Sequence, residues 1–266
     1  MSIENMVEQI MNNLSSESLM RTRLNVGVPP CIDAGQVAFG AEALDSRLSG
    51  GLVRAALHEV YAGADLDATA AAAFALLLAW RANREKPIIW VREEANARLN
   101  GKPYGHGLNE LGIPPDALLS VDAPNTIAAL RAGADITRCG AVGAVIIEPF
   151  GKALALDLTA SRRLALAAGQ SGVMTLMLRA GVEPVPSAAQ TRWRVASAPS
   201  MPLPANAPGH PAFDVMLLRH RGGIAGVEAR LEWNRDRQSF DQAPLSGGVP
   251  SVAIGGAGQA VERRAA

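Results

Sequence analysis

The sequence has few aromatic residues, few cysteines and no excess charge of either sign. Aromatic residues make up 4% of the 266 residues, so alanine, leucine and valine must fill most of the core. The two cysteines, Cys31 and Cys139, lie far apart and form no C-x-x-C pair, which is typical of reduced thiols in a cytosolic protein. The net charge of zero argues against binding duplex DNA without sequence preference, because such proteins are usually strongly basic.

Signals for export, membrane insertion and metal binding are also missing. The most apolar run, residues 68–80, is too short to cross a bilayer. The N-terminus carries Glu4 and Glu8 instead of a basic start and a long apolar run, so we expect no signal peptide. The histidines and cysteines show no metal-ligand spacing, so we expect no metal site. These features predict a cytoplasmic protein without a membrane partner.

What the sequence does have is a regular alternation of strand-like and helix-like segments. The expected strands span residues 56–61, 87–91, 118–121, 142–148 and 173–178, and the expected helices span 67–81, 107–111, 125–138 and 158–168. Strands that are apolar on both faces and separated by helices predict an α/β fold with a mostly parallel central sheet covered by helices. Three more strands, at 190–197, 213–221 and 226–234, predict an antiparallel C-terminal edge, because Gly222-Gly223 favours a hairpin.

The two ends of the chain differ from this core. Residues 2–14 predict an amphipathic helix with its apolar residues on one face: Met6, Val7, Ile10, Met11 and Leu14. Such a helix could dock a partner or pack on its own domain, and the sequence favours neither. We therefore expect an N-terminal helix and connector at 1–36, a core at 37–240, and a flexible Gly/Ala/Pro tail at 241–266.

Residues 62–69 lie between a strand and a helix, where a phosphate-binding loop would stand, but they contain no lysine. The motif G-x-x-x-x-G-K-[ST] requires Gly-Lys where this chain has Asp67 and Ala68. Only Gly63 and Thr69 would remain to contact a nucleotide. Without the ammonium group the phosphates lose their main cation, and the acidic residues of the loop would repel them. We therefore expect no ATP or Mg²⁺ cofactor.

Several segments resemble the RecA ATPase core, over roughly residues 44–235. They are LDSRLSGGL at 44–52 with HEVY at 58–61, WVREEA at 90–95, GIPPDALL at 112–119 and GAVGAVIIE at 140–148. The resemblance implies a RecA-like fold of the P-loop NTPase type. It also places Glu93 where the family carries a catalytic glutamate and Glu148 where it carries a metal-orienting aspartate. Because one carboxylate without a bound nucleotide has nothing to activate, we expect both to be solvated and non-catalytic.

The resemblance also implies that the mobile DNA-binding loops of the RecA family are reduced here. About nine residues separate Glu148 from the next expected helix, too few for a long loop. The counterpart of the second loop, residues 183–191, is rich in proline and alanine and not in basic groups.

Three tracts resemble the ImuA family, the inducible-mutagenesis accessory proteins of bacteria: GGLVRAALHEV at 50–60, RHRGG at 219–223 and LEWN at 231–234. The resemblance implies a non-catalytic scaffold in SOS-induced translesion synthesis, acting with an inactive Y-family polymerase homologue and an error-prone C-family polymerase. Two alternatives stay open. One is a weak ATPase or nucleotide switch that uses Thr69 and Glu148 to hold Mg²⁺, and the other is a regulator of RecA filaments on single-stranded DNA.

The C-terminal strands are locally basic and carry tryptophan. Arg192, Trp193, Arg194, Arg219 and Arg221 could bind a single strand or a protein partner, through phosphate pairing and base stacking. They could equally form ion pairs and cover an antiparallel edge.

Two further side chains are expected to be structural. His58 and Glu59 are neighbours on a strand and so point to opposite faces, which predicts a buried, hydrogen-bonded histidine and no catalytic pair. Cys139 lies in an apolar helix-to-strand region, which predicts a small buried thiol.

Overall fold

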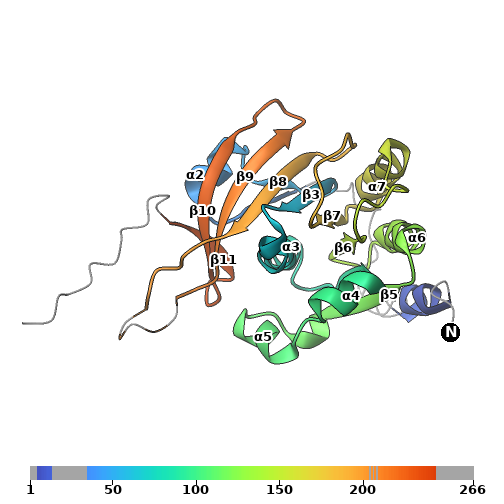
Figure 1. The fold of residues 1–266 in the computed structure, drawn as a ribbon, viewed down its shortest axis with the longest axis horizontal. Coiled ribbons are helices and arrows are strands. Elements are labelled where there is room, and N and C mark those ends of the chain that lie inside the picture. The colour runs from blue at the N-terminus through green and yellow to red at the C-terminus, as the bar shows by residue number, and fades with distance from the viewer. Residues whose placement is uncertain (1–4, 14–34, 204, 206, 208, 244–266) are drawn as a thin grey trace, which may run out of the picture.

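A single large sheet organises the computed structural model, which describes residues 5–13, 35–203, 205, 207 and 209–243 (Figure 1). Its nine strands follow the order β11-β10-β9-β8-β3-β7-β6-β4-β5. The strands are β3 (Leu57–Ala62), β4 (Ile88–Glu93), β5 (Leu118–Ala123), β6 (Ala144–Glu148), β7 (Met174–Arg179), β8 (Thr191–Ser197), β9 (Ala212–His220), β10 (Val227–Asn234) and β11 (Ser239–Ala243). A small antiparallel sheet joins β1 (Gln36–Val37) to β2 (Leu52–Val53).

The sheet changes character at β8. From β5 to β8 every neighbouring pair is parallel, whereas β8, β9, β10 and β11 pair antiparallel. This confirms the predicted parallel sheet with antiparallel strands at its C-terminal edge. The last strand was not predicted, and it continues to Ala243 where the sequence indicated a tail from residue 241. The rest of the expected tail, with most of the connector and Cys31, lies outside the described residues.

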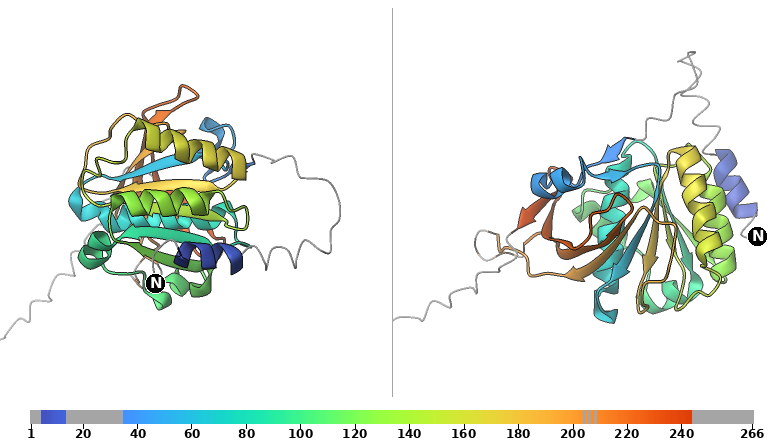
Figure 2. Two further views of the ribbon diagram at one scale, coloured as in Figure 1. Left: turned by 90° about the vertical axis from the view of Figure 1, so that its right-hand side faces the viewer. Right: turned by 90° about the horizontal axis from the view of Figure 1, so that it is seen from above.

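Helices cover both faces of the parallel strands. The long helix α3 (Ala68–Ala82) packs on one face, and α6 (Thr126–Thr137) and α7 (Leu158–Ser171) pack on the other (Figure 2). Helices α6 and α7 begin where Asn125 and Asp157 accept hydrogen bonds from the backbone N–H groups three residues ahead. The shorter helices are α2 (Glu42–Arg47), α4 (Glu94–Asn100) and α5 (Gly105–Glu110), with 3₁₀ turns at Asp65–Asp67 and Pro115–Ala117.

The scarce aromatic residues gather on one side of the sheet. Phe74 of α3 lies within 6.5 Å, between ring centroids, of four other rings: Phe39, Trp193, Phe213 and Phe240. All five rings are buried. Alanine, leucine, isoleucine and valine line most of the remaining core, as the composition predicts. The antiparallel strands are therefore joined to α3 by large side chains, which bury most area per residue.

The N-terminal helix spans residues 5–13 and packs beside α6 (Figure 1). Val7 is buried in the core on the α6 and α7 face, and Met6, Ile10 and Met11 pack against that core. The predicted amphipathic helix is confirmed over this range, and its apolar face covers its own domain. Leu14 lies outside the described residues.

Candidate functional site

The carboxylate of Asp67 closes the turn after β3, at the place where a phosphate-binding loop would hold a nucleotide. Asp67 Oδ2 accepts a hydrogen bond from the backbone N–H of Ala64 at 3.0 Å. Asp67 Oδ1 accepts from both the backbone N–H and the hydroxyl of Ser197, each at 2.9 Å. A phosphate-binding loop works by presenting such N–H groups to a phosphate. Here an internal anion already uses one of them.

The turn is also tied to the neighbouring strand through its backbone. The Gly63 N–H donates to the carbonyl oxygen of Val195 at 2.7 Å. Gly63, Asp67, Ala68 and Thr69 follow β3 directly, and Ala68 is the first residue of α3. The structure thus brings the expected residues together at the expected place. Their bonds hold the turn to β8, and no cationic side chain stands at Ala68.

Glu148 lies at the end of β6 and forms a buried ion pair. Its Oε2 accepts from Arg92 Nε at 2.6 Å and from the Trp90 indole N–H at 3.0 Å. Arg92 also donates to the carbonyl oxygen of Gly101 at 2.6 Å, and its guanidinium lies 5.0 Å from the centroid of the Trp90 ring. The expectation of a solvated Glu148 is wrong, because the neighbouring strand supplies a cation that the sequence pattern did not reveal.

Burial raises the pKa of the Glu148 carboxyl, while the Arg92 guanidinium and the Trp90 N–H act against that rise. A free carboxylate at this point could hold Mg²⁺ through water. The geometry instead gives the Arg92 guanidinium the position next to the carboxylate. What this pair does in the structure is connect β6, β4 and the segment after α4.

Glu93 is also held by hydrogen bonds. Its Oε2 accepts from the hydroxyl of Thr126 at 2.7 Å and from the backbone N–H of Phe150 at 3.0 Å. The side chain therefore joins the end of β4 to the start of α6 and to the loop after β6. Glu93 is partly exposed, so the expectation of a solvated carboxylate holds only in part, and the interpretation of Glu93 as non-catalytic stays a prediction.

Trp193 does not face solvent. It is 0% exposed, packs against Phe39 and Phe74, and donates its indole N–H to Thr191 Oγ1 at 2.9 Å. Of the two alternatives that the sequence left open, base stacking by Trp193 is therefore excluded in the folded protein. The alternation of apolar and polar residues along β8 was the signal, since it places Trp193 and Val195 on the same buried face.

The arginines of the C-terminal strands divide into two groups. Arg192 pairs with Glu59 at 2.6 Å and lies over the ring of Tyr61, and Arg219 donates to the carbonyl oxygen of Ser187 at 2.9 Å. Arg194 and Arg221 are exposed, and within the described residues neither side chain has a hydrogen-bond or ion-pair partner. Of the four arginines predicted to bind a single strand or a partner, Arg194 and Arg221 are the two whose side chains remain available.

His58 and Cys139 are structural, as predicted. His58 is fully buried, with Nδ1 2.8 Å from Thr191 Oγ1 and Nε2 2.8 Å from the carbonyl oxygen of Val53. Burial lowers the pKa of His58 to about 4. Cys139 is a buried free thiol. In the described part of the chain, no group of His, Cys, Asp and Glu residues could hold a metal ion.

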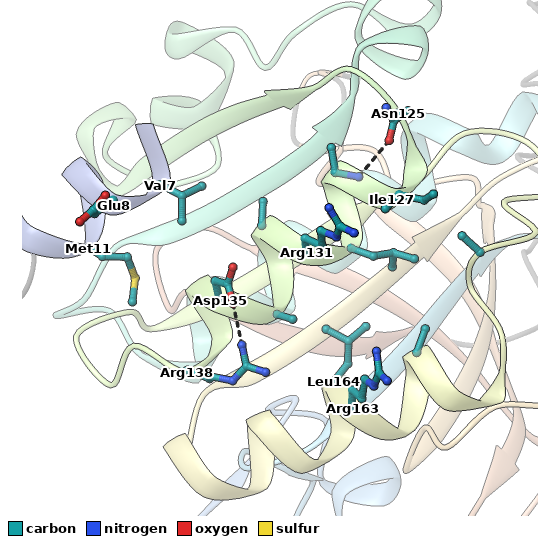
Figure 3. A pocket seen from close by; sticks show the side chains of 16 residues that line it. Val7, Glu8, Met11, Asn125, Ile127, Arg131, Asp135, Arg138, Arg163 and Leu164 are labelled. Carbon is teal, nitrogen blue, oxygen red and sulfur yellow. Dashed lines mark hydrogen bonds and ion pairs between the residues drawn. The ribbon is translucent and has the colours of Figure 1, made fainter. Parts of the chain in front are cut away.

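A groove runs between the N-terminal helix, α6 and α7, and the sequence did not predict it (Figure 3). Its volume is about 960 Å³. The apolar residues along it are Val7, Met11, Ile127, Leu130 and Leu164, and the arginines along it are Arg131, Arg138 and Arg163.

The groove is lined by three arginines and two acids, a net charge of 3 − 2 = +1. Arg138 pairs with Asp135 at 2.6 Å, whereas Arg131 and Arg163 are exposed and have no ion-pair partner among the residues described. The only other acid along the groove is Glu8. An apolar floor with two free arginines suits an amphipathic segment that carries acidic side chains.

Two relatives align with most of this chain. Protein ImuA of Caulobacter vibrioides is 33% identical over 206 residues, which are 71% of this chain and 80% of the relative, in both strain NA1000 / CB15N and strain ATCC 19089 / CIP 103742 / CB 15. The chain belongs to the ImuA family. No family model matches the sequence.

The fold has a solved counterpart in the RadB recombinase. The crystal structure of that protein superposes with a TM-score of 0.53 at 15% identity, over 79% of this chain and 100% of the recombinase chain. This confirms the RecA-like fold of the ImuA-family chain. Together, family and fold make it a RecA-like accessory protein of mutagenesis. In the described ranges no helix is both long and apolar enough to cross a bilayer.

Proposed function

We propose that this ImuA-family chain is a non-catalytic scaffold of a complex for translesion synthesis induced by DNA damage. The observation that carries the proposal is the Asp67 carboxylate bound inside the turn that would cradle a nucleotide. The ion pair between Arg92 and Glu148 and the absence of lysine at Ala68 support it. These features argue against the use of ATP, so we assign the chain the role of holding other proteins in the complex.

The partners proposed are an inactive Y-family polymerase homologue and an error-prone C-family polymerase, joined in the cytoplasm at the nucleoid. The groove beside α6 supports docking, because an amphipathic helix can lay its apolar face into a hydrophobic groove. Arg131 and Arg163 favour a helix whose flanks carry aspartate or glutamate.

The absence of catalysis is tested on the purified chain, alone and with the polymerase homologue. We expect calorimetry with ATP and Mg²⁺ to show no binding and a phosphate-release assay to show no turnover. Glu93→Gln is the matched control for contaminating ATPases. Turnover that disappears in this variant would refute a non-catalytic role and favour a weak ATPase.

The docking role is tested by co-purifying the tagged chain with the Y-family polymerase homologue. The variant with Arg131→Glu and Arg163→Glu should lose affinity, because it reverses the two free charges of the groove. Arg162→Glu is the control, since Arg162 is exposed on the same helix but does not line the groove. If the wild-type chain does not bind the homologue, the scaffold proposal is wrong.

A further inference from the structure

Large apolar side chains project from the loops that follow the parallel strands. Leu66 follows β3 and is 96% exposed; Phe150 and Leu154 follow β6 and are 43% and 90% exposed; Val185 follows β7 and is 47% exposed. In a parallel sheet, the carboxyl ends of neighbouring strands meet at one edge. These four residues, here called the carboxyl-edge surface, therefore belong to the same end of the molecule.

Contacts between these loops hold them next to one another. A Cβ atom built on Gly181, in the loop after β7, would lie 3.2 Å from Asp65 Oδ1 in the turn after β3. Arg179 at the end of β7 donates to the carbonyl oxygen of Gly151, in the loop after β6, at 2.7 Å. The three loops are thus held side by side.

The charge of these loops opposes nucleic acid. Residues 63–67, 149–157 and 180–190 contain four carboxylates and one lysine, a net charge of 1 − 4 = −3. The carboxylates are Asp65, Asp67, Asp157 and Glu183, and the cation is Lys152. Proteins bind phosphate backbones by neutralising them with lysine and arginine. Within these three loops Lys152 is the one such residue, while Arg179 is buried against Gly151 and Arg192 is paired with Glu59. The negative charge of this surface attracts a basic partner instead.

We propose that the carboxyl-edge surface binds a protein segment in which apolar side chains alternate with lysine or arginine. This inference rests on the proposed function, because it assigns the segment to the Y-family polymerase homologue. Leu66 and Leu154 are both exposed at 90% or more at this one end of the molecule, and exposed apolar patches mark interaction sites. The carboxyl edge, which holds nucleotide in P-loop enzymes, would hold a partner here.

The experiment measures the affinity of the homologue for the full-length chain by calorimetry. Leu66→Ser and Leu154→Ser should each weaken binding about tenfold, because each removes an apolar side chain that the complex buries. The variant with Asp65→Lys and Glu183→Lys should weaken it further and reduce its dependence on salt. Leu166→Ser is the control, since Leu166 is 62% exposed on α7 outside these loops. Thermal melting shows that each variant is folded.

The outcomes separate the two proposals. If wild-type chain binds and the carboxyl-edge variants bind equally well, this surface is not the interface, while the scaffold proposal stands. If the wild-type chain does not bind the homologue, both the scaffold proposal and the carboxyl-edge proposal are wrong. A parallel titration uses a 20-residue oligo-dT strand, and binding of that strand that Leu66→Ser and Leu154→Ser weaken would overturn a protein partner in favour of single-stranded DNA.

Discussion

The Asp67 carboxylate accepts hydrogen bonds from both the backbone amide and the hydroxyl of Ser197, 130 residues later in the chain. One side chain thereby joins the start of α3 to the end of β8. It also places a negative charge inside the turn, where it accepts a hydrogen bond from the Ala64 N–H. Asp67, which replaces the glycine of the phosphate-binding motif, therefore stabilises the fold.

Replacing Asp67 by alanine should destabilise the protein. The substitution removes the hydrogen bonds that the exposed Ala64 and Ser197 N–H groups make, and because water can replace them we expect a loss of about 0.5–1.5 kcal/mol in the free energy of unfolding. Urea denaturation measures it. Asp65→Ala is the control, since Asp65 is exposed in the same turn and should change stability by less than about 0.5 kcal/mol. Equal effects of the two substitutions would contradict a structural role for Asp67.

Restoring lysine alone should not restore nucleotide binding. In Ala68→Lys the Asp67 carboxylate still occupies the turn and would pair with the new ammonium, so calorimetry with ATP and Mg²⁺ should show no binding. The double variant with Asp67→Gly and Ala68→Lys removes that carboxylate and completes the Gly-Lys pair, so it should bind ATP weakly. ATP binding by Ala68→Lys alone would show that the carboxylate does not block the turn.

Breaking the buried ion pair should be costly, and the cost should depend on pH. Arg92→Met leaves Glu148 buried without its cation, which we expect to destabilise the fold by about 3–5 kcal/mol at neutral pH. The change raises the pKa of Glu148 further above its unfolded value. A raised pKa favours the protonated carboxyl in the folded state, so the lost stability should partly return as the pH is lowered toward 4.

The control for this pair is the double variant with Arg92→Met and Glu148→Leu. It removes both charges, so its unfolding free energy should lie closer to wild type than that of Arg92→Met, with no added pH dependence. Chemical denaturation at pH 5 and pH 8 measures both variants. If Arg92→Met is as stable as the double variant at pH 8, Arg92 and Glu148 do not form a buried ion pair in the folded protein.

Acid should destabilise the fold through His58. Its pKa of about 4 in the folded state lies below the usual 6.5, so between these values the unfolded chain binds a proton that the folded protein excludes. Stability contributed by neutral His58 is complete above pH 6.5 and falls as the pH drops, by about 3 kcal/mol at pH 4.

Comparison with His58→Gln isolates this effect from the titration of carboxylates. The variant should be less stable at pH 7, because it disturbs two buried hydrogen bonds, but its stability should fall less between pH 6.5 and pH 4. Urea denaturation across that range gives both slopes. Identical slopes would mean that His58 can be protonated within the fold.

Much of the fold follows from local pattern. Apolar strands such as Ala144–Glu148 and capped helices such as Thr126–Thr137 carry their own periodicity and end signals, so their type and approximate place could be predicted. The short helices Glu42–Arg47 and Glu94–Asn100 were missed, because six or seven residues are too few for a periodic signal. The strand at Ser239–Ala243 was missed because its partner, β10, decides it.

The candidate site shows the same division. The absence of lysine at Ala68 and the acids of the turn are properties of the sequence, and they predict that this turn does not hold a nucleotide. Which side chains meet is a property of the folded chain. Arg92 reaches Glu148 from the neighbouring strand, and Asp67, in the turn after β3, reaches Ser197 at the end of the neighbouring β8.

The sequence by itself determined the family, the parallel sheet and the broken phosphate-binding motif, because each is written in residues that are close along the chain. Only the tertiary structure decided that Glu148 is paired, that Trp193 is buried and that a groove lies beside α6. These features depend on residues separated by many positions, whose distances arise only when the strands pair and the helices pack on them.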